Sequence, residues 1–562
     1  MRTSFKTLLV LIIFAQILFC QRGLPKYSTG GMVVSASEIA SDVGAEILKK
    51  GGNAVDAAVA TGFALAVTYP AAGNIGGGGF MVIHLADGNN TTIDFRESAP
   101  NKSTEKMFLD SSGNFLPELS QKSWKGSGVP GTVAGLIYAL EKYGTMKLEQ
   151  VIKPAIKLAS EGFILDHYLT NSINSENNSF NKYESSKKIF TINGSKLTEG
   201  ELFIQKDLAR TLELISNGGA KAFYKGEIAH QFVNQSNING GIFTLDDFAE
   251  YHPVERKPLV GNFHGFEIIS MPPPSSGGVC LLEALNTIEH FNFSKSEWGS
   301  SKYLHVLIEV MKQIYADRAE HLGDPDFYPV PVSYLISKGY AETIKSFIGD
   351  NARPASTVTA AKIPEQYEHQ ETTHYSVADK FGNAVSTTYT LNDSYGNKIV
   401  VEGLGFLLNN EMDDFSAKPG SPNLYGLIGA YANRIQPNKR MLSSMTPTIV
   451  LKNEKPILIV GSPGGSTIIT SVLQVVLNVL LFNMNINEAI SAPHIHYQLF
   501  PDEVEYEPYG LPEDVKNNLI LRGHKFGETR SLGRVEGIYI DPNTNKFYGT
   551  SDPRGYGKAS GF

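Results

Sequence analysis

The sequence predicts a protein of the α/β class, and three stretches support this prediction. Two runs of alternating β-forming residues, 373–378 and 384–390, flank a turn cluster and predict a pair of antiparallel strands. Near the N-terminus, polar residues that cap helices precede apolar stretches with helical spacing. Further along, the apolar run 457–460 enters a glycine-rich loop and then a long apolar helix.

Length and composition are those of an ordinary globular protein. The 562 residues can bury a large core and could form two or more domains. Hydrophobic residues make up 42% of the chain and charged residues 19%, which is a usual globular composition. The formal net charge of −8, without a run of Lys or Arg, argues against a nucleic-acid partner.

Residues 1–20 have the features of a secretory signal peptide. Arg2 and Lys6 precede an apolar run from Thr7 to Phe19. A retained N-terminal membrane anchor is the alternative, but this run is shorter than the ~20 apolar residues that a membrane-spanning helix needs. We therefore expect residues 1–20 to be removed and the mature protein to be secreted and extracellular.

The cysteines and the Asn-x-Ser/Thr sequons of the chain are relevant to the expected secretion. Once residues 1–20 are removed, Cys280 is the only cysteine, so no intrachain disulfide can form, and we expect Cys280 to be a buried, small apolar residue. Several asparagines begin Asn-x-Ser/Thr and are candidate glycosylation sites: Asn89, Asn90, Asn101, Asn177, Asn193, Asn234, Asn292 and Asn392. A secreted glycoprotein is therefore expected.

The first helices follow two capping signals. A capping box from Ser35 to Glu38 predicts a helix that ends at Gly51-Gly52. Asn53 then caps a second helix, which is apolar nearly all round through about Val67 and should be buried.

The glycine run 76–79 invites comparison with a phosphate-binding loop. It leads into a predicted strand, 80–85, and not into a helix, so no helix N-terminus faces a phosphate and close backbone packing is the better interpretation. The chain returns through the strand 92–97, near whose end lies Arg96. Arg96 can form a surface ion pair with a neighbouring acid or can bind a carboxylate ligand.

The middle of the chain is mostly helical by pattern. Residues 130–350 contain helical stretches interrupted by polar segments, and the proline-rich stretch 271–278 predicts a rigid loop ahead of another helix. Residues 351–370 are polar and show little periodicity, so they are a plausible exposed lead-in to the hairpin.

The central hairpin brings two threonines face to face. A loop at 379–383 pairs residue 378 with residue 384, and the same register places Thr372 opposite Thr390, with side chains roughly 5 Å apart. We interpret the bond between Glu371 and Thr372 as a self-cleavage site. Thr372 would then be N-terminal, and its α-amino group, with an ordinary pKa of ~7.7–8.0, could take the proton from its own hydroxyl. The alternative is an ordinary hairpin with β-branched surface threonines.

Several polar features follow the hairpin. Asn392 lies on the same face as Thr390 if the strand continues. Residues 405–408 are strand-like, and the acidic cluster 411–414 after them is solvated or binds a ligand, although it lacks the spacing of a calcium loop. The long loop 416–440, which contains Tyr425, has the length of an active-site lid.

A strand, a glycine loop and a helix come together at 457–466. This order can form an anion site, but no Gly-Lys-Ser/Thr is present, so a nucleotide site is not expected. The backbone N–H groups of Gly464 and Gly465 could instead hold an oxyanion. His494 and His496 alone are weak candidates for a metal site.

Together these segments resemble the γ-glutamyltransferase (γ-glutamyltranspeptidase) family of N-terminal-nucleophile hydrolases. The similarity extends over residues 31–562 and rests on motifs in the same order: GGNAVDAA (51–58), GNIGGGGF (73–80), DFRE (94–97), TTHYSV (372–377), LNNEMDDFS (408–416), LSSM (442–445) and GSPGGS (461–466). The resemblance implies a four-layer αββα sandwich, made from one precursor that is cut into a large subunit (21–371) and a small subunit (372–562). The two chains would form a heterodimer.

The resemblance also implies roles for particular residues. Thr372 would be the nucleophile, Thr390 the hydroxyl that orients it, and Gly464 and Gly465 the oxyanion hole, while Tyr425 falls in the lid. Arg96, Ser443 and Ser444 would hold the α-carboxylate of the γ-glutamyl group, and Asn392, Glu411 and Asp414 its α-ammonium. Only a zwitterionic group needs both a cationic fork and acidic acceptors.

The implied reaction has two steps and needs neither a metal nor an organic cofactor. Thr372 would take the γ-glutamyl group from glutathione or a related compound as an acyl-enzyme, and water, an amino acid or a dipeptide would then accept it. A secreted, catalytically idle relative that acts by binding is the alternative, although Thr372, Arg96 and Asp414 are all present. A solute-binding protein would not need one threonine opposite another.

Overall fold

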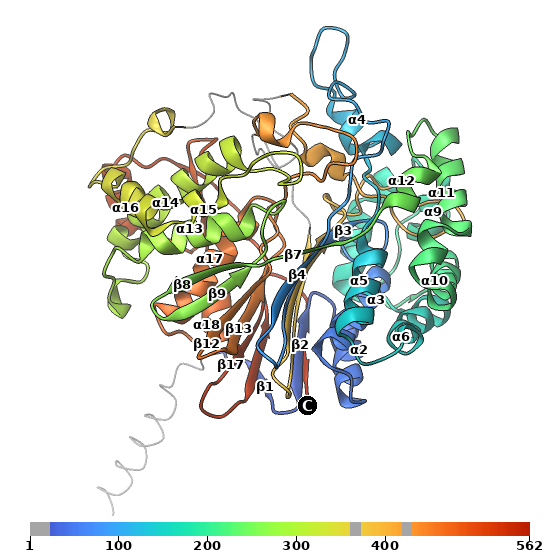
Figure 1. The fold of residues 1–562 in the computed structure, drawn as a ribbon, viewed down its shortest axis with the longest axis horizontal. Coiled ribbons are helices and arrows are strands. Elements are labelled where there is room, and N and C mark those ends of the chain that lie inside the picture. Colours follow the sequence, from blue (N-terminus) through green and yellow to red (C-terminus); the bar gives the residue numbers. More distant parts are fainter. Residues whose placement is uncertain (1–22, 360–371, 419–428) are drawn as a thin grey trace, which may run out of the picture.

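The structure, a computed structural model, describes residues 23–359, 372–418 and 429–562. Two seven-stranded antiparallel sheets lie face to face, and helices cover the outer face of each sheet (Figure 1). These four layers, helix, sheet, sheet and helix, confirm the predicted αββα sandwich.

The first sheet is built around the predicted hairpin. Its strands follow the order β19 (Lys558–Gly561), β2 (Gly31–Ser35), β10 (Thr373–Asp379), β11 (Ala384–Thr390), β3 (Gly78–His84), β4 (Asn90–Phe95) and β7 (Val254–Arg256). Ala378 pairs with Ala384 and Thr373 pairs with Tyr389, which confirms the predicted register of the hairpin. The hairpin therefore lies in the interior of the sheet, between β2 and β3.

The second sheet faces the first. As in the first sheet, strands that are far apart in the sequence are neighbours. Its strands are β1 (Lys26–Ser28), β18 (Phe547–Ser551), β17 (Glu536–Ile540), β13 (Lys455–Gly461), β12 (Thr448–Lys452), β9 (Phe266–Ser270) and β8 (Leu259–Phe263). Two smaller sheets contain β14 (Ile495–His496), β15 (Val504–Tyr506) and β16 (Phe526–Thr529), and β5 (Phe163–Ile164) with β6 (Leu202–Phe203).

Helices form the two outer layers, which lie on opposite sides of the sheets in Figure 1. On the first sheet pack α2 (Glu38–Lys49), α3 (Ala54–Thr68) and α5 (Thr132–Tyr143), with α6 (Leu148–Glu161) and α10 (Lys206–Tyr224) beyond them. On the second sheet pack α13 (Gly277–Ile288), α17 (Thr467–Leu480) and α18 (Ile486–Ser491), and α14 (Ser301–His321) and α16 (Lys338–Phe347) pack on α13. Other helices are α4 (Pro117–Gln121), α7 (His167–Ser175), α8 (Asn177–Phe180), α9 (Glu184–Phe190), α11 (Glu227–Ile238), α12 (Leu245–Glu250), α15 (Val332–Leu335) and α19 (Glu513–Leu521).

Side chains of β10 alternate between the two faces of the first sheet. Tyr375 and Val377 belong to the core shared with α3. Ser376 points the other way, and its hydroxyl donates to the backbone carbonyl of Glu536 on β17 of the second sheet at 3.0 Å. Because the strand period is two, Thr372 is on the same side as Ser376 and faces the layer between the sheets.

The two predicted helix starts have different outcomes. Asn53 caps α3 in a capping box with Asp56, and every residue of α3 is buried, as predicted. The predicted cap of α2 was wrong, because Ser37, whose side chain accepts a hydrogen bond from the N–H of Ala40, begins that helix. Ser35 is the last residue of β2 and pairs with β10, so its backbone belongs to the sheet.

The glycine run packs closely against neighbouring backbone, which confirms that interpretation. A Cβ atom on Gly77 would lie 2.0 Å from the carbonyl oxygen of Thr390, and one on Gly79 would lie 2.3 Å from that of Thr388. Since real Cβ atoms do not approach oxygen so closely, only glycine lets β3 lie against β11 here.

Residues 405–408 do not form the predicted strand. Only an isolated bridge joins Leu407 to Val400. Gly405 has a φ of 74°, and a Cβ atom there would lie 2.3 Å from the backbone nitrogen of Leu208 in α10. A few backbone hydrogen bonds with residues 397–401, such as that of the Leu408 N–H with the Ile399 carbonyl at 2.9 Å, and the contact with α10 together hold this segment.

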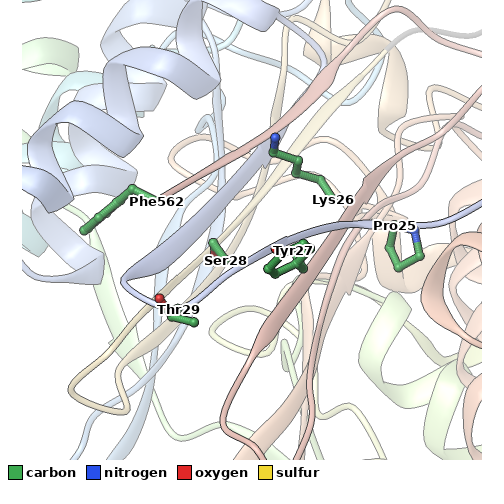
Figure 2. A pocket seen from close by; sticks show the side chains of 6 residues that line it. All are labelled: Pro25, Lys26, Tyr27, Ser28, Thr29 and Phe562. Carbon is green, nitrogen blue, oxygen red and sulfur yellow. The ribbon is translucent and has the colours of Figure 1, made fainter.

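A surface pocket of about 330 Å³ lies beside the C-terminus. Figure 2 shows the residues that line it, which are Pro25, Lys26, Tyr27, Ser28, Thr29 and Phe562. The Phe562 carbonyl oxygen accepts hydrogen bonds from the backbone N–H groups of Thr29 and Gly30, at 3.1 Å and 2.6 Å. None of the predicted catalytic residues lies in this pocket.

The predicted signal peptide, the bond before Thr372 and Tyr425 all involve residues outside the described ranges. Within those ranges, no helix is both long and apolar enough to span a membrane. Cys280 is buried, as predicted, and burial raises the pKa of its thiol well above the usual value.

Candidate active site

The two threonines of the hairpin meet at the start of β10. The hydroxyl of Thr372 donates to the hydroxyl oxygen of Thr390 at 3.4 Å, and both side chains are buried. The Thr390 oxygen also accepts the backbone N–H of Asn392 at 2.8 Å. Asn74 fixes the backbone beside them by donating to the Thr390 carbonyl at 2.9 Å. The predicted pairing of Thr372 with Thr390 is therefore present in the folded chain.

The glycine loop of the second sheet reaches the same place from the opposite side. It follows β13, which faces β10 across the sandwich, and precedes α17. Gly464 and Gly465 have φ angles of 131° and 52°, which side-chain-bearing residues rarely adopt. Within the part of the chain that the structure describes, neither backbone N–H donates to an acceptor. Both groups are thus available to an oxyanion.

One pocket gathers most of the predicted site residues. It is lined by Arg96, Arg318, Thr372, Thr390, Asn392, Asp414, Ser443, Ser444, Met445, Gly465 and Ile468. Gly464 is adjacent to Gly465, and Glu411, which is not itself part of the lining, lies 2.5 Å from Arg96. Arg318, Met445 and Ile468 were not predicted. Within the described ranges, no group of three or more His, Cys, Asp or Glu side chains could hold a metal ion.

Three carboxyl groups surround the guanidinium of Arg96. Its Nη1 atom lies 2.5 Å from Glu411 Oε2 and 3.4 Å from Glu97 Oε2, while Nη2 lies 2.5 Å from Asp414 Oδ2. Arg96 is 1% exposed, so the surface ion pair considered from the sequence is excluded. Burial acts to lower the pKa of Arg96, but the neighbouring carboxylates outweigh it and raise the pKa above its usual value.

Burial also raises the pKa of each acid in this cluster. The pKa of Glu411 lies well above its usual value, that of Asp414 is raised, and that of Glu97 is raised to about 7. Arg96 opposes the shift in all three cases. The guanidinium of Arg96 is therefore the group that favours the ionised form of these three acids.

Glu97 is expected to make the fold less stable as the pH rises. The folded state keeps the Glu97 proton up to about pH 7, whereas the unfolded chain releases it near its reference pKa of 4.5. The contribution of Glu97 to the free energy of unfolding is therefore complete below the pKa of the unfolded chain. It is lost as the pH rises to the pKa of the folded state, and the loss is on the order of 3 kcal/mol at most.

Thermal unfolding at about pH 5 and about pH 8 tests this expectation. The melting temperature of wild type should fall more between the two than that of Glu97→Gln, which stays neutral. Equal falls in both proteins would show that Glu97 does not titrate in this way.

Ser443 and Ser444 are held by the loop that precedes α13. The backbone N–H of Ser443 donates to the Pro274 carbonyl at 3.0 Å, and the Ser443 carbonyl accepts the N–H of Ser276 at 2.7 Å. Arg318, on α14, donates from Nε to Ser276 Oγ at 2.9 Å and from Nη2 to Ser444 Oγ at 3.2 Å. The two serines thus have fixed positions beside Thr372.

Asn392 reaches the pocket by a route that the sequence did not predict. β11 ends at Thr390, and Asn392 has a φ of 78°, so the strand does not continue through it. Its side-chain amide donates to the Asn410 carbonyl at 3.0 Å, and the residue is 2% exposed. A bend in the backbone, and not strand alternation, brings Asn392 beside Thr390.

The fold and the site together define the class of the protein. Two facing antiparallel sheets between helical layers, with a threonine at the start of an interior strand and a glycine loop opposite it, are the architecture of N-terminal-nucleophile hydrolases. The crystal structure of cephalosporin acylase from Bacillus halodurans has this fold. It is similar with a TM-score of 0.86 at 28% identity, over 97% of this chain and 98% of that one.

Sequence comparison places the chain within that class. The Gamma-glutamyltranspeptidase family matches residues 40–562, and the chain belongs to this family of enzymes. A relative from Escherichia coli (strain K12), the Glutathione hydrolase proenzyme, is 49% identical over 532 residues, which are 94% of this chain and 91% of the relative. The crystal structure of Helicobacter pylori gamma-glutamyltranspeptidase covers 60% of this chain and 95% of its own, with 48% identity and a TM-score of 0.57.

Proposed function

We propose that this enzyme is a secreted γ-glutamyltransferase and glutathione hydrolase with Thr372 as its nucleophile. The observation that carries the proposal is the hydrogen bond of Thr372 with Thr390, 3.4 Å long, in a pocket shared with Gly465, Arg96 and Asp414. Membership of the family and the names of its relatives support γ-glutamyl compounds, including glutathione, as donors.

Self-cleavage between Glu371 and Thr372 activates the enzyme in this proposal. An internal threonine has no base of its own, whereas an N-terminal threonine carries an α-amino group beside its hydroxyl. Thr390 accepts from the Thr372 hydroxyl and so holds the attacking oxygen in one orientation. The proenzyme names of relatives support such processing.

The two chains formed by the cleavage would remain one particle, because each sheet contains strands from both chains. In the first sheet, β10 and β11 of the small subunit (372–562) lie between β2 and β3 of the large subunit (21–371). In the second sheet, the large subunit's β1 and β9 lie on either side of strands from the small subunit. Separation would break several complete ladders of hydrogen bonds, so a stable heterodimer is expected.

The reaction proceeds through an ester of Thr372. The α-amine takes the hydroxyl proton while the oxygen attacks the γ-carbonyl of the donor, and the N–H groups of Gly464 and Gly465 stabilise the oxyanion that develops. The amine then returns its proton to the departing nitrogen, which is that of Cys-Gly when glutathione is the donor. Water, or the amine of an amino acid or dipeptide, attacks the ester and frees Thr372.

The charges of the pocket suit the α-carbon of a γ-glutamyl group. Arg96, Ser443 and Ser444 offer donors to its carboxylate, while Asn392, Glu411 and Asp414 offer acceptors to its ammonium. In the structure, Arg96 pairs with Glu411 and Asp414. The site thus supplies its own counterions until a zwitterion replaces them, which lowers the cost of burying these charges.

Asn392 is expected to carry no glycan, although it begins a sequon. It is 2% exposed and touches the donor pocket, so a sugar there would fill the site. Asn89, Asn193, Asn234 and Asn292 are exposed and could be modified in a secreted protein. Glycopeptide mapping of active secreted enzyme should find sugar on some of these and none on Asn392. A sugar on Asn392 would contradict both its role and the pocket.

Release of chromophore from a γ-glutamyl anilide tests the proposed function. Purified wild type should release it, and glycylglycine should increase the rate if transfer competes with hydrolysis. A denaturing gel of the same sample should show two chains. An active sample that remains one full-length chain would rule out Thr372 as the N-terminal nucleophile.

A further inference from the structure

We propose that Arg318 supplies the positive charge that selects the α-carboxylate of the γ-glutamyl donor. It would act by its own charge in the pocket and by its hydrogen bond to Ser444. This inference rests on the proposed function and adds to it a residue that determines specificity. It follows from how the charges in the pocket are already paired.

The charge of Arg96 is offset before any donor binds. Its two terminal nitrogens lie 2.5 Å from Glu411 and 2.5 Å from Asp414, and Glu97 is a third neighbour. Arg96 can still donate a hydrogen bond to a carboxylate, but it brings no net positive charge to the pocket. Another cation is needed if the pocket is to attract an anion into a buried place.

Arg318 is a cation without a close carboxylate. It lines the pocket with Thr372 and Ser444 and is 5% exposed. Its guanidinium donates to the hydroxyls of Ser276 and Ser444. Among the described residues, no carboxylate oxygen lies within 4.0 Å of it. Burial lowers the pKa of Arg318, whereas that of Arg96 is raised.

An unpaired buried guanidinium is costly, and a carboxylate from the donor would remove that cost. Asp414 is the nearby acid that acts on Arg318, from beyond ion-pair distance, and Asp414 is itself bonded to Arg96. The donor's ammonium and carboxylate can therefore divide the pocket between them. The ammonium takes the acids around Arg96, and the carboxylate takes the side with Arg318 and the serines.

The geometry of Ser444 carries this charge to the ligand. Its oxygen accepts from Arg318 Nη2 at 3.2 Å. A hydroxyl has one hydrogen to donate, and accepting from a guanidinium makes that hydrogen a stronger donor. Ser444 therefore presents its hydrogen to an acceptor in the pocket, and a carboxylate is the acceptor that gains most.

A purely structural role for Arg318 would give a different result. Through Ser276, whose hydroxyl donates to the Ser443 carbonyl at 2.6 Å, Arg318 also supports the serine segment. If that support were its whole role, removing Arg318 would impair every substrate equally. If it selects the carboxylate, the loss depends on whether the substrate has one.

The test compares two anilides that differ at one group. One is the γ-glutamyl anilide, and in the other an uncharged carboxamide replaces the α-carboxylate. Arg318→Gln is expected to lower kcat/KM for the first roughly 30-fold and for the second less than about 3-fold. Arg318→Lys keeps the charge without the planar fork, so its discrimination should lie between wild type and Arg318→Gln.

Arg353→Gln is the matched control. Arg353 is a partly buried arginine that pairs with Glu309 of α14, the helix that carries Arg318, at 2.8 Å, but it is absent from the pocket lining. Any change it causes should be the same for both anilides. Cleavage into two chains and the melting temperature show whether each variant is folded. If Arg318→Gln does not mature, the comparison is made with Arg318→Lys, which should still lose discrimination.

The possible outcomes separate this inference from the proposed function. Equal losses for both anilides in the matured Arg318 variants would overturn the inference and leave the function standing. A wild-type enzyme that did not prefer the γ-glutamyl anilide to the carboxamide would overturn the proposed substrate itself. A loss confined to the anilide that carries a carboxylate supports both.

Discussion

Thr372→Ala is expected to accumulate as one uncut chain that transfers no γ-glutamyl group. The hydroxyl of Thr372 has two tasks in this mechanism, since it attacks the bond before Thr372 during maturation and the donor carbonyl afterwards. Alanine removes the oxygen and keeps the backbone of β10, which is paired on both sides in the interior of the first sheet. The variant should therefore fold while losing both reactions.

Two further variants separate the hydroxyl from the rest of the side chain. Thr372→Ser retains a hydroxyl, so it should mature and turn over, although more slowly than wild type. Thr390→Ala removes the oxygen that accepts from Thr372 at 3.4 Å, so it should mature or act poorly. Gel analysis and chromophore release from a γ-glutamyl anilide, with and without glycylglycine, measure both properties.

One outcome would favour a binding protein over an enzyme. Wild type would have to be cut correctly, release no chromophore, and bind γ-glutamyl compounds no better than Thr372→Ala. Family membership does not favour this alternative.

Arg96→Ala is expected to lower kcat/KM for a γ-glutamyl anilide roughly 30-fold or more. This corresponds to a loss of about 2 kcal/mol or more of transition-state stabilisation. The variant loses a donor to the α-carboxylate. It also leaves Glu411, Asp414 and Glu97 without their common cation, and unpaired buried charges are destabilising. The melting temperature should therefore fall as well. A substitution that removed only a contact with the substrate would leave the melting temperature unchanged.

Asp414→Ala serves as the companion variant because it removes an acceptor for the ammonium and keeps Arg96 paired with Glu411. It should also weaken use of the γ-glutamyl anilide. Asp414→Ala should lower kcat/KM less for an anilide that lacks the α-amine than for the γ-glutamyl anilide. Wild-type kcat/KM in either variant would show that the corresponding role is wrong.

Local pattern was enough to predict the parts of the fold that local forces determine. Alternation and the short turn at 379–383 set the register of β10 with β11, and the structure has that register. Asn53 capped α3 as predicted, since a side chain and its own helix start decide that contact. The four-layer sandwich followed only from the family resemblance, and the order of strands across the two sheets was not predicted, because nothing local encodes which distant strands pair.

The site was predictable where it consists of motifs and was missed where packing makes it. Thr372, Thr390 and Gly465 lie in segments with their own patterns, and the fold brings them into one pocket. Arg318 lies within a long buried helix, where its sequence neighbours resemble those of any amphipathic helix. Only the packing of α14 on α13 brings Arg318 to Ser444.

Two corrections have the same physical origin. Ser35 resembled a helix cap, but pairing of β2 with β10 took its backbone into the sheet. Asn392 was expected on a continuing strand, but the chain bends there with a φ of 78°, a conformation that asparagine tolerates better than most residues. In both places tertiary contacts overrode a local preference.

Mass spectrometry of the smaller chain, taken shortly after mixing active enzyme with a γ-glutamyl donor, tests Thr372 as the N-terminal nucleophile most directly. The chain should begin with Thr372-Thr373-His374-Tyr375, and a fraction of it should carry one γ-glutamyl group on Thr372. That fraction should fall when glycylglycine is added, because the acceptor removes the acyl group. A γ-glutamyl group on another residue, or active enzyme whose chain begins elsewhere, would contradict the mechanism.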